Sequence, residues 1–432
     1  MAFNSPNHSR FGLQPRVLFY CIAAAFLCGF FSRRGRAQEI LAPPPPDFSG
    51  LSPALRTTGT NQPGEIPPLA APAREQSLFQ LGPVQFKPHF LYRFLYGDGI
   101  SARPGEQVTT AIQEVYPGIL LRLGDRWNLD YTPILRFYSN SHFRDTVDHN
   151  AVLSAATVYE DWTIGFSQSY TSSSQPLAET AAQTDEEVYT TGLNLVYQMS
   201  SATSLELGVR QYFLFAGQSV PGQFLTDTRS WSSLDWLNYQ FSPKIAIAIG
   251  AGVGYDNLSV GSDMISEQLQ GRIILRPGDK LSFSASGGAE IRQLVDVKSS
   301  NLISPLFGLS AQYQLFESTT LGLGANRLVS PSLFLNQLTE TTTVSANLHQ
   351  RIFKKLFLDL SGGYIHTSYR FTIFGFDLAR EDDGTYFNAR LSASLFKRGS
   401  AAVFYQTSDN SSTASAFVFS STQVGFELGY RF

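Results

Sequence analysis

The feature that most constrains this chain is an alternation of apolar residues with polar or small ones, which recurs from residue 84 to the end. Residues 244–255, for example, place Ile245, Ile247 and Ile249 on one side of an extended segment and alanine or glycine on the other. Successive side chains of a strand point to opposite faces, so this two-residue period predicts strands with one apolar face. No helical period of 3.6 residues competes over a comparable length.

Short turn signals separate the alternating segments and recur every 35 to 44 residues. They are Gly124-Asp125, Glu160-Asp161, Ser200-Ser201, Ser242-Pro243, Pro277-Gly278, Glu317-Ser318, Lys354-Lys355 and Arg398-Gly399. Longer polar stretches lie between them, and we place long connections at residues 171–185, 215–227, 328–336, 370–383 and 409–421. Tight connections that alternate with long ones are typical of an array of antiparallel hairpins.

The amino terminus has the composition of a secretory signal. Residues 1–37 begin with basic residues and contain the apolar run 17–31, and we expect cleavage after Ala37. The run is too short to cross a bilayer as a helix, which needs roughly 20 residues. Both Cys21 and Cys28 lie in this segment, so the processed chain has neither a disulfide framework nor a thiolate metal site.

Residues 38–83 form a proline-rich segment that includes the run Pro43 to Pro46. Proline at this density favours an extended, polyproline-like tether without a packed core. A plain spacer and a docking strip for a periplasmic partner are both consistent with it.

A soluble β-sandwich would show the same alternation with its apolar face inward, but three features favour a transmembrane barrel over residues 84–432. The first is the signal without cysteines in the processed chain. The second is the polar face, whose Gly, Ser, Asn and charged residues suit a wet lumen, with aromatic residues near the short turns as interfacial girdles require. These aromatics are Trp127, Tyr131, Tyr159, Trp162, Tyr197, Tyr239 and Phe241.

The third feature is the last strand. Residues 423–432 read QVGFELGYRF, with Val424, Phe426, Leu428, Tyr430 and Phe432 on one face. This stretch resembles the carboxy-terminal strand of Gram-negative outer-membrane β-barrel proteins. The resemblance implies an outer-membrane location among lipid and lipopolysaccharide, and an insertion signal at Tyr430 and Phe432 that is read by the barrel-insertion machinery. Residues 82–99 (GPVQFKPHFLYRFLYGDG) are similar to the start of β-barrel porins encoded beside exopolysaccharide loci.

The fold class that we predict is therefore all-β, an antiparallel transmembrane β-barrel of about eighteen strands. The expected strand starts lie near residues 84, 107, 126, 147, 161, 186, 203, 228, 244, 264, 280, 302, 319, 337, 356, 384, 400 and 422. Sixteen strands are the alternative, because residues 140–185 and 400–421 are hard to assign. Both termini then lie on the short-turn, periplasmic side. Three prolines fall inside the first three strands, where each removes a ladder donor, so bulges or rims are expected there: Pro88, Pro117 and Pro133.

The polar faces of these strands are expected to line the lumen. The predicted pore-lining residues are Lys87, Arg93, Arg122, Asp130, Arg136, Glu206, Arg210, Arg272, Glu290, Arg292, Arg351, Asp359, Arg390, Glu427 and Arg431. Ten are basic and five acidic, and the acids Glu179, Asp185, Glu186, Glu187, Asp377, Glu381, Asp382 and Asp383 fall in the proposed long loops. A wall of one sign raises the local concentration of counter-charged solutes, which predicts mild anion preference. Alternatively the arginines pair with acids on their own face, as in Glu290 with Arg292 or Glu427 with Arg431.

A barrel of this size has room for an aqueous channel, so we expect passive diffusion of small hydrophilic solutes. The alternative is a non-catalytic outer-membrane component of a polysaccharide export or secretion assembly. We expect no enzyme activity, cofactor or metal, since no nucleophile elbow, phosphate loop or dinucleotide fingerprint appears in context. One polar cluster could hold a metal, but a solvated loop explains it better: His142, Asp145, Asp148 and His149. Removing residues 1–37 leaves 27 basic and 35 acidic residues, which argues against nucleic acid as a partner. The oligomeric state stays open.

Overall fold

The computed structural model describes residues 79–217, 224–295, 301–353, 355–372, 376–396 and 398–431. The signal segment, most of the proline-rich tether and Phe432 lie outside the described residues. The strands are β1 (Phe79–Leu81), β2 (Val84–Arg103), β3 (Glu106–Leu123), β4 (Trp127–Tyr138), β5 (Thr146–Tyr159), β6 (Trp162–Leu177), β7 (Ala182–Gln198), β8 (Thr203–Gly217), β9 (Thr228–Ser242), β10 (Ile245–Leu258), β11 (Met264–Gly278), β12 (Leu281–Leu294), β13 (Leu302–Phe316), β14 (Thr319–Pro331), β15 (Gln337–Ile352), β16 (Leu356–Phe371), β17 (Asp377–Leu395), β18 (Gly399–Ser412) and β19 (Phe419–Arg431), with one 3-10 turn, η1 (Ser415–Phe417).

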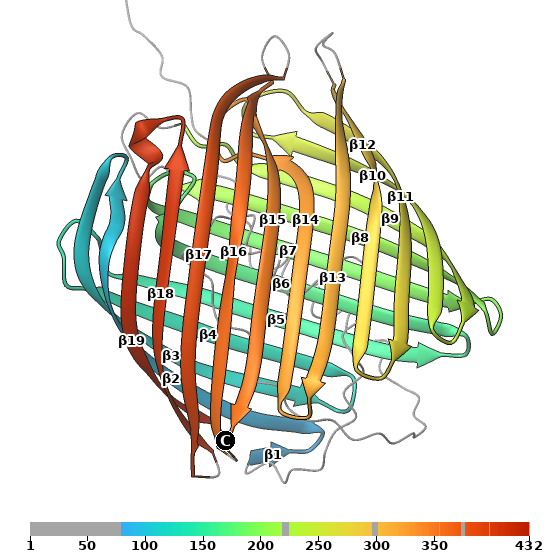
Figure 1. Cartoon of the computed structure of the whole chain (residues 1–432), viewed down its shortest axis with the longest axis horizontal. Coiled ribbons are helices and arrows are strands. Elements are labelled where there is room, and N and C mark those ends of the chain that lie inside the picture. Colours follow the sequence, from blue (N-terminus) through green and yellow to red (C-terminus); the bar gives the residue numbers. More distant parts are fainter. Residues whose placement is uncertain are drawn as a thin grey trace, which may run out of the picture. The chain divides into compact units, whose positions relative to one another are not determined.

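Strands β2 to β19 form a closed antiparallel barrel (Figure 1). Each strand pairs with the next along the chain, and β19 pairs with β2 from Thr422 opposite Asp98 to Arg431 opposite His89. Closure gives every strand of the barrel a partner on both sides, so that no strand is left as a free edge. The prediction of eighteen strands is confirmed, and the alternative of sixteen is wrong.

The first residues of the strands agree closely with the expected starts, with three exceptions. Strands β7, β17 and β19 begin at Ala182, Asp377 and Phe419, three to seven residues earlier than expected. The polar stretches for which the sequence predicts long connections mostly continue the neighbouring strands: residues 171–177 belong to β6, and Asp382 and Asp383 to β17. Polar residues sustain strand pairing where water covers both faces, which is why polarity alone misplaced these boundaries. The acids expected in loops therefore lie largely in strands.

Strand β1 lies within the segment expected to be a tether. Phe79, Gln80 and Leu81 pair with the beginning of β2, opposite Phe86, Gln85 and Val84. Strand β19 pairs with β2 only as far as His89. Strand β1 therefore pairs with the part of the same edge of β2 that lies closer to the rim. In Figure 1 both β1 and the carboxy-terminal end of the chain lie at the rim that carries the short turns.

The outer surface of the barrel is apolar. Along β10 the residues Ile249 and Val253 are 58% and 59% exposed, whereas the alternate residues Gly250 and Gly252 are buried. Aromatic residues stand near both ends of the outward faces, as Trp231 and Tyr239 do on β9. Tyr430, half of the expected insertion signal, is 41% exposed on β19. The alternation predicted from sequence is thus realised with the apolar side outward.

Pro117 of β3 and Pro133 of β4 lie neither at bulges nor at rims. They occupy the same level of the barrel, where the pairing of β3 with β4 is interrupted between Val115 and Ile119. Two residues without backbone donors thus share one gap in the ladder. Pro88 lies towards the rim, one residue beyond His89, the last residue of β2 that pairs with a described residue of β19.

The ring of His89 packs over Gly118, where a Cβ atom would lie 2.0 Å from its Nε2. The same nitrogen is 3.0 Å from Thr132 Oγ1.

Candidate functional site: the lumen wall and the hairpins that cross it

The strand register places all fifteen predicted pore-lining residues on the inner face. Arg93 of β2, for example, lies opposite Glu427 of β19 and Glu114 of β3, and its neighbours along the strand point outward. The structure brings several of them together into a continuous row of charges. That solutes touch these residues stays a prediction.

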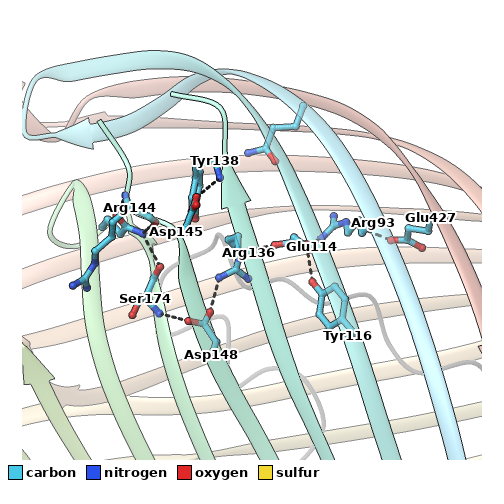
Figure 2. A network of polar contacts seen from close by, with 12 residues as sticks. Arg93, Glu114, Tyr116, Arg136, Tyr138, Arg144, Asp145, Asp148, Ser174 and Glu427 are labelled. Atoms are coloured by element: carbon cyan, nitrogen blue, oxygen red, sulfur yellow. Dashed lines mark hydrogen bonds and ion pairs between the residues drawn. The ribbon is translucent and has the colours of Figure 1, made fainter. Parts of the chain in front are cut away.

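This charge ladder consists of Asp359, Arg390, Glu427, Arg93, Glu114, Arg136 and Asp148, and Figure 2 shows its part from Glu427 to Asp148. Arg390 Nη2 lies 2.9 Å from Glu427 Oε2, and Arg93 lies 3.5 Å from carboxylate oxygens of both Glu427 and Glu114. Arg136 Nε donates to Glu114 Oε1 at 2.6 Å and its Nη1 contacts Asp148. Each guanidinium therefore sits between two carboxylates.

The ladder contains two acids that the sequence reasoning missed. Glu114 lies on the same face of β3 as Arg122, and Asp148 lies in the stretch whose strands were hardest to assign. A third missed acid, Asp256 of β10, accepts a hydrogen bond of 2.7 Å from Arg292 Nη1. With these acids counted, the inner wall is less positive than expected. The pairing alternative is confirmed for Glu290 and Arg292, 2.9 Å apart, whereas Glu427 pairs with Arg93 and Arg390 instead of Arg431.

A second charged group lies on the wall formed by β8 to β11. Arg272 donates to Glu206 at 2.7 Å and to Asn238 at 2.8 Å, and its guanidinium lies 4.3 Å from the centre of the Trp236 ring. The indole packs directly over Gly250, where a Cβ atom would approach the ring to 2.6 Å. Glycine is therefore required opposite this tryptophan. The group is braced internally, as a structural element of the wall would be.

The lumen is crossed by the upper part of the β14–β15 hairpin, residues 327–342, which we call the crossing hairpin. The pairing of β13 with β14 ends at Phe307 and Arg327, and beyond this point the hairpin separates from β13, while β15 stays paired with β16 as far as Gln337 opposite Phe371. Leu338 belongs by alternation to the outward face of β15, where Val344 is 50% exposed, yet Leu338 is fully buried. It packs with Leu258, Met264 and Leu294, residues of the inner faces of β10 to β12.

Polar contacts hold the crossing hairpin against the same inner wall. Ser304 of β13 donates to Glu340 at 2.7 Å, and Arg292 of β12 donates to the Val329 carbonyl oxygen at 3.3 Å. Within the hairpin itself, Arg327 Nη2 donates to Glu340 at 2.7 Å. The outward side of the hairpin has thus turned inward and fills the lumen beside β10 to β13.

The tip of the crossing hairpin reaches the opposite side of the barrel. Strands β6 and β14 are eight positions apart in the closed order, so the β6–β7 and β14–β15 hairpins rise from nearly opposite sides. Even so, Ser332 Oγ and the Leu333 backbone N–H donate to Glu179 Oε1 at 2.6 and 2.8 Å. Leu333 packs against Leu177 and Leu214, on the inner faces of β6 and β8. The β6–β7 and β14–β15 connections therefore contact each other across the lumen.

Glu179 is the ionisable group at this meeting point. Its side chain is buried, and burial raises the pKa of the carboxyl, while the hydrogen bonds from Ser332 and Leu333 lower it. Nearby charge acts in both directions, since Arg380 lowers this pKa and Glu186 raises it. The Arg380 guanidinium donates to the Glu179 carbonyl oxygen and lies 3.8 Å from the ring centres of both Tyr369 and Phe417. The meeting point is therefore tied to three further strands or turns.

A cavity of about 120 Å³ lies on the other side of the crossing. Residues 175–178 of the β6–β7 hairpin line one side of it, and inner-face residues of β2 to β4 and β17 to β19 line the other. Arg93, Glu114 and Arg136 of the charge ladder are among them. A smaller cavity of about 40 Å³ shares the linings Ala178, Tyr386, Ser408 and Phe419 with it.

The polar cluster considered as a metal site is not assembled. Asp148 faces the lumen and contacts Arg136, whereas His149 accompanies Tyr131 on the outward face, with ring centroids 6.2 Å apart. Among the described residues no group of three or more His, Cys, Asp or Glu side chains is placed to hold a metal ion. The described part of the chain also has no helix long and apolar enough to span a bilayer.

The chain is similar in architecture to solved barrels of Gram-negative bacteria. Acinetobacter baumannii OccAB4 matches at 12% identity over 80% of this chain and 98% of its own, with a TM-score of 0.41. Pseudomonas aeruginosa OccK11 (OpdR) matches at 12% identity over 81% and 96%, with a TM-score of 0.39. The siderophore receptor PirA of P. aeruginosa matches at 9% identity over 80% of each chain, with a TM-score of 0.40.

No family model and no curated protein matches the sequence. Identities near 10% and TM-scores below 0.5 transfer no solute, partner or activity to this chain.

Proposed function

We propose that this chain is an outer-membrane, porin-like channel for the passive diffusion of small hydrophilic solutes, without catalytic activity. The observation that carries the proposal is the closed barrel of eighteen strands, apolar outside and lined by polar and charged side chains within. A barrel of eight strands is filled by its own side chains, whereas one of 16 to 18 encloses an aqueous channel. The apolar outer face fits the hydrocarbon of a bilayer.

The crossing hairpin sets the size of solute that such a channel admits. Its apolar contacts with Leu258, Met264 and Leu294 fill the side of the lumen next to β10 to β12. The cavity of about 120 Å³ lies on the remaining side, beside the charge ladder. Solutes would therefore pass along the inner faces of β2 to β4 and β17 to β19. Such a path favours molecules of a few heavy atoms over oligosaccharides.

A mild anion preference is the finer part of the proposal. The arginines of the charge ladder are matched by carboxylates, so they contribute little net field. The support comes from inward bases close to the short turns, where a basic mouth would attract anions. These are Lys87, Arg122, Arg351 and Arg431. The reversal potential in a KCl gradient across a planar bilayer tests it: we expect chloride to be favoured a few-fold at most, and potassium selectivity would contradict it.

Single-channel recording of the purified chain tests the channel itself. We expect discrete conductance steps in KCl, and partition of neutral solutes that falls steeply between glycerol and disaccharides. If disaccharides enter the channel as readily as glycerol does, the crossing hairpin does not narrow the lumen. A silent bilayer, together with co-purification of an export complex, would favour the alternative of a polysaccharide export or secretion component, which the proline run Pro43 to Pro46 could tether to a periplasmic partner.

A further inference from the structure

Three side-chain amides stand side by side on the wall of the larger cavity. Asn388 of β17 pairs in register with Gln406 of β18, and Gln406 with Gln423 of β19, so all three lie at one level and point to the inner face. All three line the cavity. We call this group the amide row.

A row of hydroxyl groups lies one step above the amide row. Tyr386 is in register with Ser408, and Ser408 with Ser421, on the same inner faces of β17 to β19. These three residues also line the cavity. The wall here therefore presents two adjacent rows of neutral hydrogen-bonding groups. One step below the amide row lie Arg390, Phe404 and Leu95, so two apolar side chains and one arginine of the charge ladder border it there.

The bonds already made within the amide row leave part of its capacity unused. Gln406 Nε2 donates to Gln423 Oε1 at 2.6 Å, Gln423 Nε2 donates to Ser421 Oγ at 3.4 Å, and Arg93 Nη2 donates to Gln406 Oε1 at 3.3 Å. An amide side chain offers two N–H donors and an oxygen with two lone pairs. The three amides together therefore offer more donors and acceptors than these bonds use, and can bind a solute that carries both.

The charged residues of the cavity are occupied with one another. Arg136 Nε lies 2.6 Å from Glu114, and Arg93 lies 3.5 Å from Glu114 and Glu427. An anion that bound Arg93 would have to compete with two carboxylates, and a cation that bound Glu114 with two guanidinium groups. An apolar solute would displace water from these half-buried amides without replacing its hydrogen bonds, which is unfavourable. Neutral groups with adjacent hydroxyls fit the row best.

From this arrangement we propose that the amide row is a binding site for small neutral polyols, which pass through the barrel by way of it. The inference rests on the proposed channel function and adds the class of solute. A hydroxyl group both donates and accepts, so neighbouring hydroxyls of one solute can match the donors and acceptors of the row. Since roughly 10–15 Å³ of such volume is enough to hold one water molecule, about 120 Å³ has room for a small polyol of a few carbons.

The test is the flux of labelled erythritol into liposomes that contain the full chain. For the wild type we expect flux that saturates with erythritol concentration and is competed by glycerol. The double variant Asn388→Leu with Gln406→Leu removes the hydrogen-bonding groups and keeps side chains of similar size. We expect its half-saturating erythritol concentration to rise about three- to tenfold, because one to two hydrogen bonds to the solute are lost.

The matched control changes two amides elsewhere on the inner wall. Gln270 of β11 donates to Gln268 at 2.7 Å, and neither lines the cavity. Gln268→Leu with Gln270→Leu should leave erythritol saturation unchanged. If the leucine variant at the amide row loses KCl conductance and so fails to fold, the smaller change Asn388→Ala takes its place with the same expected direction.

Conductance in KCl separates the two proposals. Wild-type conductance with erythritol flux that stays linear in concentration overturns the polyol site and leaves the channel standing. An equal rise of the half-saturating concentration in the control variant also overturns it. Absence of conductance in the wild type overturns the channel function, and the polyol site with it.

Discussion

Arg136 is the residue that the inner wall beside the cavity depends on most. Its side chain is 1% exposed and lies between the carboxylates of Glu114 and Asp148. A buried ion pair contributes little net stability, but removal of one partner leaves an uncompensated charge in a low dielectric. Here the loss of one guanidinium would leave the Asp148 carboxylate in that state, and Glu114 would keep Arg93 alone, at 3.5 Å.

We predict that Arg136→Ala lowers the free energy of unfolding by about 3–5 kcal/mol, because a buried charge loses its partner. Urea titration of the barrel in lipid vesicles, followed by tryptophan fluorescence, measures this. The control is Arg351→Ala, since Arg351 is an exposed inward arginine near a short turn. Equal effects of the two substitutions would contradict the structural role of the ladder.

The contact between Glu179 and the crossing hairpin should depend on pH, and the raised pKa of the Glu179 carboxyl determines in which direction. Because burial raises its pKa above that of an exposed glutamate, the closed contact binds a proton more tightly than an open one does. The contact is therefore strongest below about pH 4, near the ordinary carboxyl pKa, and weakens as the pH rises through the raised pKa.

We accordingly expect wild-type conductance to increase as the pH is raised from about 4 to about 8, a range that starts near the ordinary carboxyl pKa. Glu179→Gln keeps an oxygen that can accept from Ser332 and Leu333 but does not titrate in this range. The conductance of this variant should stay at the low-pH level throughout. A variant that reproduces the wild-type pH profile would assign the titration to another group.

Among single residues, sequence reasoning identified inward positions more reliably than their partners. The alternation placed Arg93 and Glu427 on the inner face, and the structure does the same. Their partner Glu114 could have been found from Arg122, which shares its face of β3. That Glu427 contacts Arg93, across the closing seam, depends on the register of strands more than three hundred residues apart, which no local pattern contains.

Among the strands and hairpins, the inward bend of the crossing hairpin is the feature that the sequence does not predict. Alternation along β15 assigns Leu338 and Glu340 to the lipid side with Val344, yet both are buried against the inner wall. A two-residue period reports which side of a strand is apolar and does not report where the strand bends. The bend is determined by packing against Leu258, Met264 and Leu294 on other strands.

Leu333→Asp tests the element directly. Leu333 is 2% exposed and packs on Leu177 and Leu214, so a carboxylate there would be buried without a partner and should release the tip from the opposite wall. We expect larger single-channel conductance and entry of larger neutral sugars. Leu333→Met preserves size and apolar character and should behave as the wild type. Unchanged conductance in Leu333→Asp would show that the tip does not restrict the bore.

At the scale of the whole molecule, one distribution of side chains accounts for the barrel and its bore. Apolar residues such as Ile249 and Val253 cover the outside, and the charge ladder, the amide row and the crossing hairpin occupy the inside. The count of strands and most of their starts were predictable because each hairpin repeats the same local pattern. The narrowing of the lumen was not, because it arises from contacts between opposite sides of the ring.

Cysteine accessibility along β10 tests directly whether the apolar face of the barrel points outward. In a chain with Cys21→Ser and Cys28→Ser, single cysteines would replace Ala246 and Ala248 on the inner face, and Ile247 and Ile249 on the outer face. In proteoliposomes, we expect a charged, membrane-impermeant thiol reagent to label positions 246 and 248 and to spare 247 and 249. Labelling of 247 and 249 with protection of 246 and 248 would contradict the outward apolar face.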